Sequence, residues 1–177
     1  MNLLAIPLLE TPRLRLQLMQ PSDVDALLCI FADPKVMAAF QAPPFDRTQM
    51  TQWVQRNLDH QIAHGYGLFS VLVKDNDVLI GDCGLELIDV DGTQVAELGY
   101  DFRSDYWNQG YATEAAQAVR DYAFTHLHLP RLISLIRVGN TPSRRVAEKI
   151  GMRCIGEHTR YGHQYWQYTL DRTSASE

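Results

Sequence analysis

The fold of this chain is organised around residues 96–116, which read AELGYDFRSDYWNQGYATEAA. In the first part, apolar residues alternate with Glu97, Gly99 and Asp101, which is the period-two pattern of a strand. From Ala112 onward, apolar residues recur at steps of three and four, which is typical of one face of a helix. The stretch therefore predicts a strand, a loop and a helix in succession.

The loop meets the helix at Gly110. Glycine reaches backbone angles that other residues avoid, and it lets another molecule come close. The first N–H groups of a helix lack partners within it, and the helix dipole adds positive potential there, so a phosphate group could bind. A plain turn explains the same glycine, because the chain has neither the Walker ending Gly-Lys-Ser/Thr nor three spaced glycines. The candidate phosphate-binding residues are Asn108, Gln109, Gly110, Tyr111, Ala112 and Thr113.

Composition places the chain among ordinary globular proteins. Its 177 residues, 46% apolar and 21% charged, suit a single domain over 1–177, with a loose tail at 171–177. The net charge of -5 does not favour nucleic acid as a partner. Three cysteines without metal-ligand spacing indicate reduced thiols in a cytoplasmic protein. No apolar run approaches the roughly 20 residues of a membrane-spanning helix, so no membrane partner is expected.

Periodicity along the remaining chain predicts an α/β fold of the α+β kind, with one mixed sheet. Six to seven strands are expected, mostly antiparallel, with one parallel β-α-β crossover formed by 95–102, 111–127 and 131–138. The expected strands cover 13–18, 67–74, 78–88, 95–102, 131–138, 152–158 and 164–170. About four helices are expected, beginning near residues 22, 46, 111 and 141.

The helix over 46–64 has a recognisable start, because Asp46 and Gln49 fit a capping box. Its expected buried stripe is Met50, Trp53, Val54, Leu58 and Ile62. His60 and His64 share one face, but the Glu of the zinc motif His-Glu-x-x-His is absent, so no metal is expected. For the last helix, Thr141 is the expected cap.

Three motifs, in the order in which they occur, resemble the GNAT superfamily of N-acyltransferases, and more narrowly its RimJ/RimL-like branch. Residues 107–112, WNQGYA, are similar to the acyl-CoA loop Arg/Gln-x-x-Gly-x-Gly/Ala at its first glycine and final alanine. They depart from it at the first position, which is Trp107. The other two motifs are LIG at 79–81 and NTPS at 140–143, and the resemblance covers about 9–157.

The resemblance implies a cofactor and a place for it. Acetyl-CoA would be the co-substrate, with its phosphates on the loop at 108–113 and its pantetheine arm between two splayed parallel strands. Backbone groups near Asp101, Phe102 and Arg103 would hold the pantetheine amides and polarise the thioester carbonyl. Asn140 would hydrogen-bond the donor or line the path of the acceptor.

Ser143 is the candidate proton donor to the leaving sulfur. Many members of the superfamily use a tyrosine four residues before the glycine that matches Gly151, and this chain has Ala147 there. By the same resemblance, Ser143 would lie near the sulfur and relay a proton to it. Capping of the last helix is the alternative role for Asn140 and Ser143.

Acyl transfer to an amine also needs a proton acceptor, because an α-amine has a pKa of about 7.7–8 and lysine of about 10.4. Glu97 is the first candidate, since alternation places it on the face opposite Leu98 and related enzymes often carry a Glu on this strand. An ordinary outward-facing Glu is the alternative. Asp101 and Glu86 are the reserve candidates for the base.

These observations lead to one hypothesis and a rival. The chain is expected to be an N-acetyltransferase that moves acetyl from acetyl-CoA to a primary amine by direct attack, the amine being a peptide N-terminus or a small molecule. The resemblance places the acceptor beside the early helices, where Phe40, Phe45 and Trp53 are either substrate contacts or core. The rival is a CoA-binding or sensing module without efficient turnover. A homodimer is compatible with the sequence, which does not specify one.

Overall fold

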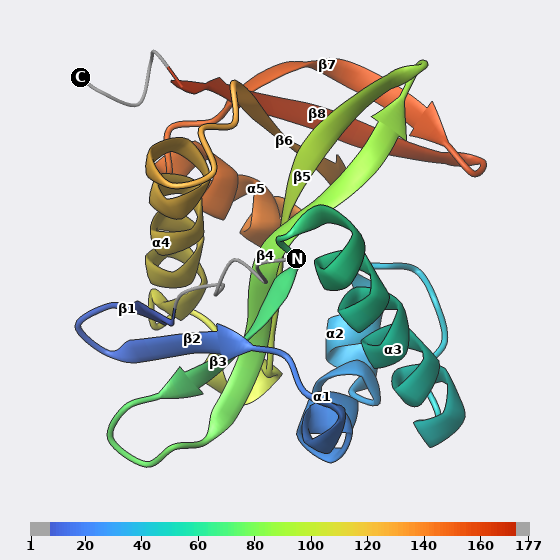
Figure 1. Cartoon of the computed structure of the whole chain (residues 1–177). Helices are drawn as coiled ribbons and strands as arrows, with labels where there is room; N and C mark the ends of the chain where they lie inside the picture. The colour runs from blue at the N-terminus through green and yellow to red at the C-terminus, as the bar shows by residue number, and fades with distance from the viewer. Residues whose placement is uncertain (1–7, 173–177) are drawn as a thin grey trace.

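A computed structural model describes residues 8–172, and Figure 1 shows how the elements are arranged. Eight strands form one sheet in the order β1-β2-β3-β4-β5-β6-β8-β7. The strands are β1 (Leu9–Glu10), β2 (Leu14–Leu18), β3 (Leu68–Val73), β4 (Leu79–Val90), β5 (Thr93–Phe102), β6 (Arg131–Arg137), β7 (Arg153–Arg160) and β8 (His163–Asp171). The helices are α1 (Val24–Phe31), α2 (Pro34–Ala38), α3 (Arg47–His64), α4 (Tyr111–Thr125) and α5 (Thr141–Lys149), with 3-10 turns at Pro21–Asp23 and Ser104–Tyr106.

The expected mixed sheet with one parallel crossover is confirmed, since β5 and β6 are its one parallel pair within residues 8–172. Residues 8–172 contain eight strands rather than six to seven, because Leu9–Glu10 forms a two-residue edge strand too short to show a period. The same residues contain five α-helices rather than four. Asp33 caps the short helix α2 by accepting a hydrogen bond from the Lys35 amide at 2.8 Å.

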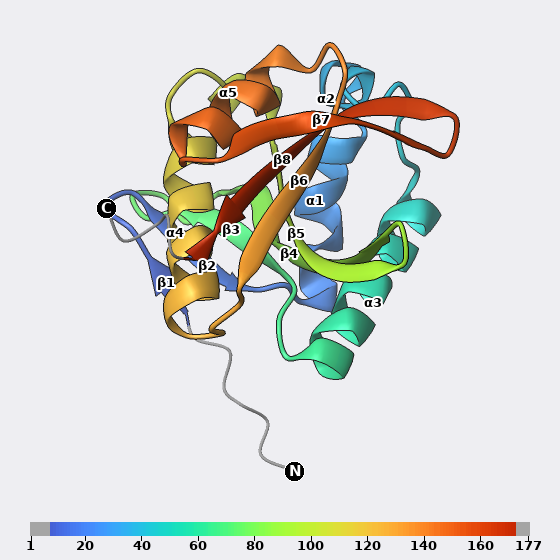
Figure 2. The same ribbon diagram turned by 90° about the horizontal axis from the view of Figure 1, so that it is seen from above.

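Helices cover both faces of the sheet, and Figures 1 and 2 show α4 on one side of β4 and β5 and α1 to α3 on the other. One apolar core lies beneath α4 and α5, and a second lies between α1, α2, α3 and strands β3 and β4. Strand alternation therefore sends the side chains of β5 into two different environments. Leu98 and Phe102 enter the core beneath α4, while Glu97 and Asp101 lie on the other face.

Polar residues, rather than an unbroken apolar stripe, join α3 to the sheet. The capping box of Asp46 and Gln49 is confirmed, but Ile62 is exposed and is not part of the core. The buried Asn57 accepts a hydrogen bond from the Leu68 amide at 3.0 Å, and Gln61 donates to the Leu68 carbonyl at 2.9 Å. The expected stripe is wrong at Ile62 because the start of β3 presents unpaired backbone groups that need polar partners.

His60 joins α3 to two further backbone groups. Its Nδ1 lies 2.9 Å from the Tyr66 carbonyl oxygen, and its Nε2 accepts a hydrogen bond from the Leu87 amide at 2.8 Å. Because Nε2 acts as an acceptor, the ring is neutral in the folded protein. Burial lowers the pKa of His60 below its ordinary value of 6.5.

The contribution of His60 to stability should therefore be lost on acidification. The pKa of His60 is lower in the folded state than in the unfolded chain, so its contribution is complete above pH 6.5 and is lost as the pH falls toward the folded value. His60→Ala should lower the free energy of unfolding by about 1–3 kcal/mol at pH 7.5, because two backbone groups lose their partner. Denaturant unfolding at several pH values measures both effects. The exposed His64 serves as the control, and an equal loss in His64→Ala would contradict this role.

The two ends of the described region correct the expected boundaries. Asp171 belongs to β8 rather than to a loose tail, and its carboxylate accepts a hydrogen bond from Arg131 Nε at 2.6 Å. The rest of the expected tail, residues 173–177, lies outside the described residues. Between residues 8 and 172, no helix combines the length and apolar character that crossing a membrane requires.

Candidate active site

The mouth of α4 presents a row of free backbone amides. Gly110 is the N-cap residue and has a φ of 84°, in the left-handed region that favours glycine. No side chain caps this helix, and among residues 8–172 the amides of 108–113 have no hydrogen-bond acceptor. These N–H groups, with the positive end of the helix dipole, form a site of the kind that binds phosphate groups.

Residues from the start of the chain brace this loop, a contact that the sequence did not predict. Thr11 Oγ1 donates to Glu114 Oε1 at 2.6 Å, and Arg13 donates to the same carboxylate through its amide and its Nε. Arg13 also donates to the Gln109 carbonyl at 2.9 Å and lies 4.2 Å from the centre of the Tyr111 ring. Burial opposes ionisation of Glu114, but the bonds from Thr11 and Arg13 outweigh it and lower its pKa. The loop is thus held in shape before any ligand arrives.

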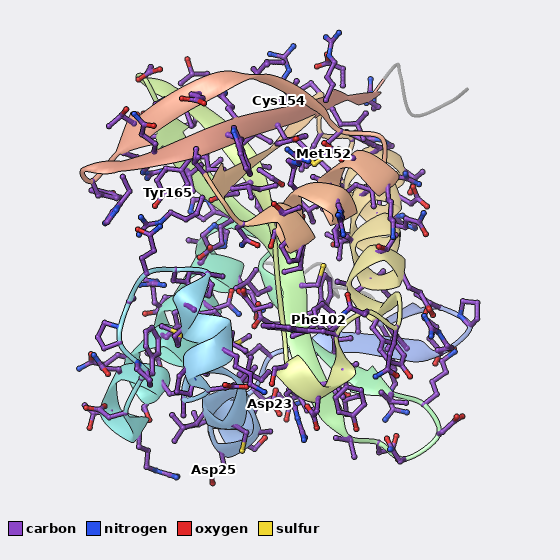
Figure 3. All side chains as sticks on the ribbon, turned by 180° about the vertical axis from the view of Figure 1, so that it is seen from behind. Asp23, Asp25, Phe102, Met152, Cys154 and Tyr165 are labelled. Atoms are coloured by element: carbon purple, nitrogen blue, oxygen red, sulfur yellow. The ribbon has the colours of Figure 1, made fainter. Side chains whose placement is uncertain are left out.

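Trp107, where the chain departs from the family pattern, ties the loop to β5. Its indole Nε1 donates to the Phe102 carbonyl at 2.8 Å, and Phe102 lies at the end of β5 (Figure 3). The Arg103 amide donates to the Ile80 carbonyl at 2.8 Å, and its guanidinium pairs with Asp105 at 2.7 Å. The backbone N–H of Arg103 is therefore paired within the protein, and the expected role of the backbone near Arg103 in holding the pantetheine arm stays a prediction.

Strands β5 and β6 separate soon after they meet. They pair only at Ala96 with Leu132 and at Glu97 with Ile133. Beyond that point, single side chains bridge the two strands. Ser134 Oγ donates to the Leu98 carbonyl at 2.7 Å, and the Leu135 amide donates to Glu97 Oε1 at 3.0 Å. Glu97 thus lies at the point where the gap opens, and beyond it the side of β5 that faces β6 has no strand partner in the described part of the chain.

Helix α5 begins beside the same gap. Asn140, not Thr141, is its N-cap residue, and its Oδ1 accepts a hydrogen bond from the Ser143 amide at 3.3 Å. The capping role considered for Asn140 is therefore present, which leaves its expected ligand contact untested. Tyr100 donates through its hydroxyl to the Ser143 carbonyl at 2.7 Å, which holds the first turn of α5 against β5. The Ser143 side chain is half-buried, and its hydroxyl has no hydrogen-bond partner among the described residues.

Four carboxylates gather on the face of β4 and β5 that looks toward α1 to α3. They stand in two cross-strand pairs: Asp82 opposite Asp101, and Glu86 opposite Glu97. Burial raises the pKa of Glu97 to about 7 against the opposing effect of the Leu135 amide, and burial with the neighbouring Glu86 and Glu97 raises that of Asp101 to about 7. Burial, with Asp101 nearby, also raises the pKa of Asp82 well above its ordinary range. Two groups that titrate near neutral pH are suited to accepting a proton.

Asp82 is a site residue that the sequence reasoning missed. Its side chain is 1% exposed, and neither carboxylate oxygen has a hydrogen-bond partner within residues 8–172. The signal was present in the two-residue turn Asp91–Gly92, because a hairpin that closes there pairs Val90 with Thr93 and, eight residues further along each strand, Asp82 with Asp101.

A cavity of about 400 Å³ opens over this face. Its carboxylate floor is Asp82, Glu86 and Asp101, beside Gly99. Its other lining residues are Phe31, Met37, Phe40, Ala42, Phe45, Trp53, Arg56, Leu68 and Arg137. The three aromatic residues named from the sequence, Trp53, Phe40 and Phe45, all line this cavity. They are half-buried and also pack against the second core, so the structure is compatible with both roles considered for them. Glu97 is not among the lining residues and lies toward the gap between β5 and β6.

Comparison with known proteins agrees with this architecture. Residues 13–153 match the family model described as an acetyltransferase (GNAT) domain. An uncharacterized N-acetyltransferase p20 of Bacillus licheniformis is 35% identical over 149 residues, covering 84% of this chain and 83% of the relative. A GNAT-family acetyltransferase structure from Bacillus anthracis has a TM-score of 0.80 at 28% identity, covering 94% of this chain and 99% of that one.

The fold also matches RimL, a ribosomal α-N-protein acetyltransferase solved in complex with coenzyme A, with a TM-score of 0.73 at 18% identity over 94% of this chain and 97% of that one. At that identity the likeness concerns the fold alone. The family model and the Bacillus licheniformis relative show that this chain belongs to the GNAT family of acetyltransferases, and it is an N-acetyltransferase. Members of this family use acetyl-CoA.

Proposed function

We propose that this protein transfers the acetyl group of acetyl-CoA to a primary amine by direct attack within a ternary complex. The observation that carries the proposal is that three features lie on or next to β5. These are the free amides of 108–113 in the loop that follows β5, the gap that opens at Glu97, and the carboxylate-lined cavity on the face of the sheet toward α1 to α3. A donor held at the amides would extend its pantetheine arm into the gap, and an amine in the cavity would reach the thioester beside Glu97.

Glu97 is the proposed base. It touches β6 through the Leu135 amide, and of the two groups that titrate near neutral pH it lies closer to the gap. The amine nitrogen attacks the thioester carbonyl carbon, a C–N bond replaces the C–S bond, and the proton lost from nitrogen passes to Glu97. The CoA thiolate leaves and takes a proton through Ser143, the proposed acid. The side chain of Asp101 is assigned to acceptor binding. Its backbone is assigned to the donor, as the resemblance suggests, and Asn140 and Phe102 also keep their proposed places along the donor path.

A direct test incubates the purified protein with isotopically labelled acetyl-CoA and a panel of amines and short peptides. Mass spectrometry of the amines should find labelled acetamides, and CoA thiol should appear in equal amount. Acetyl-CoA binding without labelled product would favour the CoA-sensing module. Absence of binding at millimolar acetyl-CoA would remove the proposal altogether.

Ser143→Ala should lower kcat by about 10-fold or more while changing the Kd for acetyl-CoA less than about twofold. The reason is that the hydroxyl acts on the departing sulfur, whereas the Ser143 backbone keeps its bonds to Asn140 and Tyr100. Steady-state kinetics and calorimetric titration separate the two quantities. Thr141→Ala is the matched control, because Thr141 lies two residues before Ser143 in the first turn of α5, and this variant should retain kcat. Equal kcat in Ser143→Ala and wild type would remove the assigned role.

The amine is proposed to be either a protein N-terminus or a small molecule, as in the RimJ/RimL-like branch. RimL and a ribosomal-protein-S5-alanine acetyltransferase of Vibrio fischeri share the fold, and their names concern ribosomal proteins. We also propose that the whole chain works as one cytoplasmic unit, which the three free cysteines support.

A further inference from the structure

Gly99 leaves the floor of the cavity open, although the packing of the protein does not require a glycine at this position. A Cβ atom placed on Gly99 would meet nothing within 4 Å. The neighbouring strand glycines differ, since a Cβ on Gly81 would lie 2.4 Å from the Asp101 carbonyl and one on Gly84 would lie 2.3 Å from the Gly67 carbonyl. The φ angle of Gly99 is not positive, so its backbone conformation does not require a glycine either. A glycine inside a strand weakens it, and one reason to keep it is the close approach of a ligand.

An aromatic wall stands over this opening. Phe31, at the end of α1, is its centre, and the Trp53, Phe45 and Phe40 rings lie 5.0, 5.5 and 6.2 Å from it between centroids. The Phe45 amide donates to the Phe31 carbonyl at 2.9 Å, which fixes the loop that carries Phe45. The rings thus pack on one another and present an apolar side of the cavity, and apolar surfaces of this kind position the apolar part of a small ligand.

The charges around the cavity are unevenly placed. Asp82, Glu86 and Asp101 lie at the floor, and Asp82 is buried without a hydrogen-bond partner in residues 8–172. A buried carboxyl group in this state is stabilised by any ligand that donates hydrogen bonds to it. Two arginines, Arg56 and Arg137, belong to the same lining, and Arg56 is exposed. Arg137 donates to the Phe40 carbonyl at 2.7 Å, which joins it to the aromatic wall.

A cation therefore finds its partners at the floor and meets positive charge elsewhere in the lining. One ammonium group can lie near Asp82 and Asp101 over Gly99. A second ammonium group, several carbons away, would lie among aromatic rings and near Arg56 or Arg137, where like charges repel. An apolar group in that position loses water and gains contacts with the wall.

From these observations we propose that the acceptor is a monocationic primary amine whose nitrogen is attached to a compact, ring-sized apolar body. The ammonium lies over Gly99 at the carboxylate floor, and the body lies against Phe31, Phe45 and Trp53. This inference rests on the proposed acetyl transfer, in which the nitrogen attacks the thioester carbon, CoA thiolate departs, and the products are an N-substituted acetamide and CoA. A free arylalkylamine and a peptide with an aromatic first residue share this chemistry.

The acceptor class can be tested on the purified full chain with saturating acetyl-CoA. The value of kcat/KM should be at least about 10-fold higher for 2-phenylethylamine than for n-butylamine or spermidine. Two tripeptides, one beginning with Phe and one with Ser, show whether the acceptor is a free amine or a peptide. If it is a peptide, transfer to the Phe peptide should be faster than transfer to 2-phenylethylamine. Preference for spermidine or for the Ser peptide would overturn the proposal.

A single substitution should close the opening. Gly99→Val should lower kcat/KM for 2-phenylethylamine at least about 10-fold and weaken its binding in calorimetry with CoA present, while the Kd for acetyl-CoA changes less than about twofold. Gln94→Val adds the same side chain to an exposed position of the same strand and is the control. Gly99→Ala replaces the valine variant if that variant does not fold. Unchanged kcat/KM and amine binding in a folded Gly99 variant would contradict the assignment.

Failure of this inference is distinguishable from failure of the proposed function. If no amine is acetylated and acetyl-CoA does not bind, the transfer itself is wrong. If acetyl-CoA binds and other amines are acetylated while 2-phenylethylamine is not, only the acceptor class is wrong. Calorimetric measurement of 2-phenylethylamine binding gives a readout that does not depend on turnover.

Discussion

Glu97→Gln should lower kcat by about 100- to 10,000-fold, the range expected when a general base is lost. Glutamine keeps the shape of the side chain and an oxygen that can accept the Leu135 amide, so the gap between β5 and β6 should stay open. The Kd for acetyl-CoA should change little, because the proposed donor contacts are backbone amides at 108–113. Pre-steady-state and steady-state measurement of acetamide formation gives the loss directly.

The pH dependence identifies the group further. Burial raises the pKa of Glu97 to about 7, and a base works only when ionised, so kcat should rise with pH and level off above that value. Measurement of kcat against pH with amines of different pKa separates titration of the enzyme from titration of the acceptor. A decrease in kcat below about pH 7 (the acid limb) that occurs at the same pH for every amine belongs to the protein. Glu157→Gln, on an exposed part of β7, is the matched control. An unchanged acid limb in Glu97→Gln would transfer the role to Asp101, whose pKa is also raised to about 7.

The same substitution has a signature in stability. The folded protein keeps a proton on Glu97 up to about pH 7, whereas the unfolded chain releases it above the ordinary value of 4.5. The contribution of Glu97 to the stability of the wild type should therefore fall as the pH rises from 4.5 to about 7, and this part of the slope should vanish in Glu97→Gln. Loss of activity with gain of stability near pH 7.5 would separate a functional carboxylate from a merely structural one.

Gly110→Val should raise the Kd for acetyl-CoA by at least about 10-fold, which corresponds to ~1.4 kcal/mol. A side chain in the left-handed region costs about 1–2 kcal/mol, and a β-branched residue is especially disfavoured there. The backbone would relax toward negative φ and turn the amides of 108–113 away from a common point. A Cβ at Gly110 would also lie 3.3 Å from Arg13 Nη2, within the brace that holds the loop.

Gly92→Val supplies the matched control for backbone strain. Gly92 has a φ of 81°, close to the 84° of Gly110, and lies in the turn between β4 and β5 with no atom within 4 Å of its Cβ position. Both variants should lose similar stability in thermal denaturation, and only Gly110→Val should lose donor affinity in calorimetry. Equal donor affinity in the two folded variants would show that the phosphate groups bind elsewhere.

The order of strands and helices could be predicted from the sequence because each element has a clear period. Residues 93–102 alternate, α4 repeats at three and four, and Gly110 stands between them, so local patterns decide the crossover. The capping box at Asp46 was predictable for the same reason, since its two partners are three residues apart. Features of this kind need no knowledge of what lies across the molecule.

The features that the sequence did not predict join distant segments. Glu114 is held by Thr11 and Arg13, about a hundred positions earlier, and nothing in the pattern of α4 specifies that contact. His60 and Asn57 face inward on a helix whose apolar residues predict a different stripe, because β3 and β4 present backbone groups to them. The hydrogen bond from the Arg103 amide to the Ile80 carbonyl is a further contact between separate segments that the sequence did not predict.

In the proposed reaction, strand β5 meets the two substrates on different surfaces. Gly99 and Asp101 line the cavity, whereas Glu97 and the backbone of Leu98 face the gap beside β6. A replacement at Gly99 can therefore alter which molecule is modified and leave the activated carrier untouched. Descendants of one ancestral chain could in this way acquire new targets one residue at a time, while every intermediate remained a working transferase.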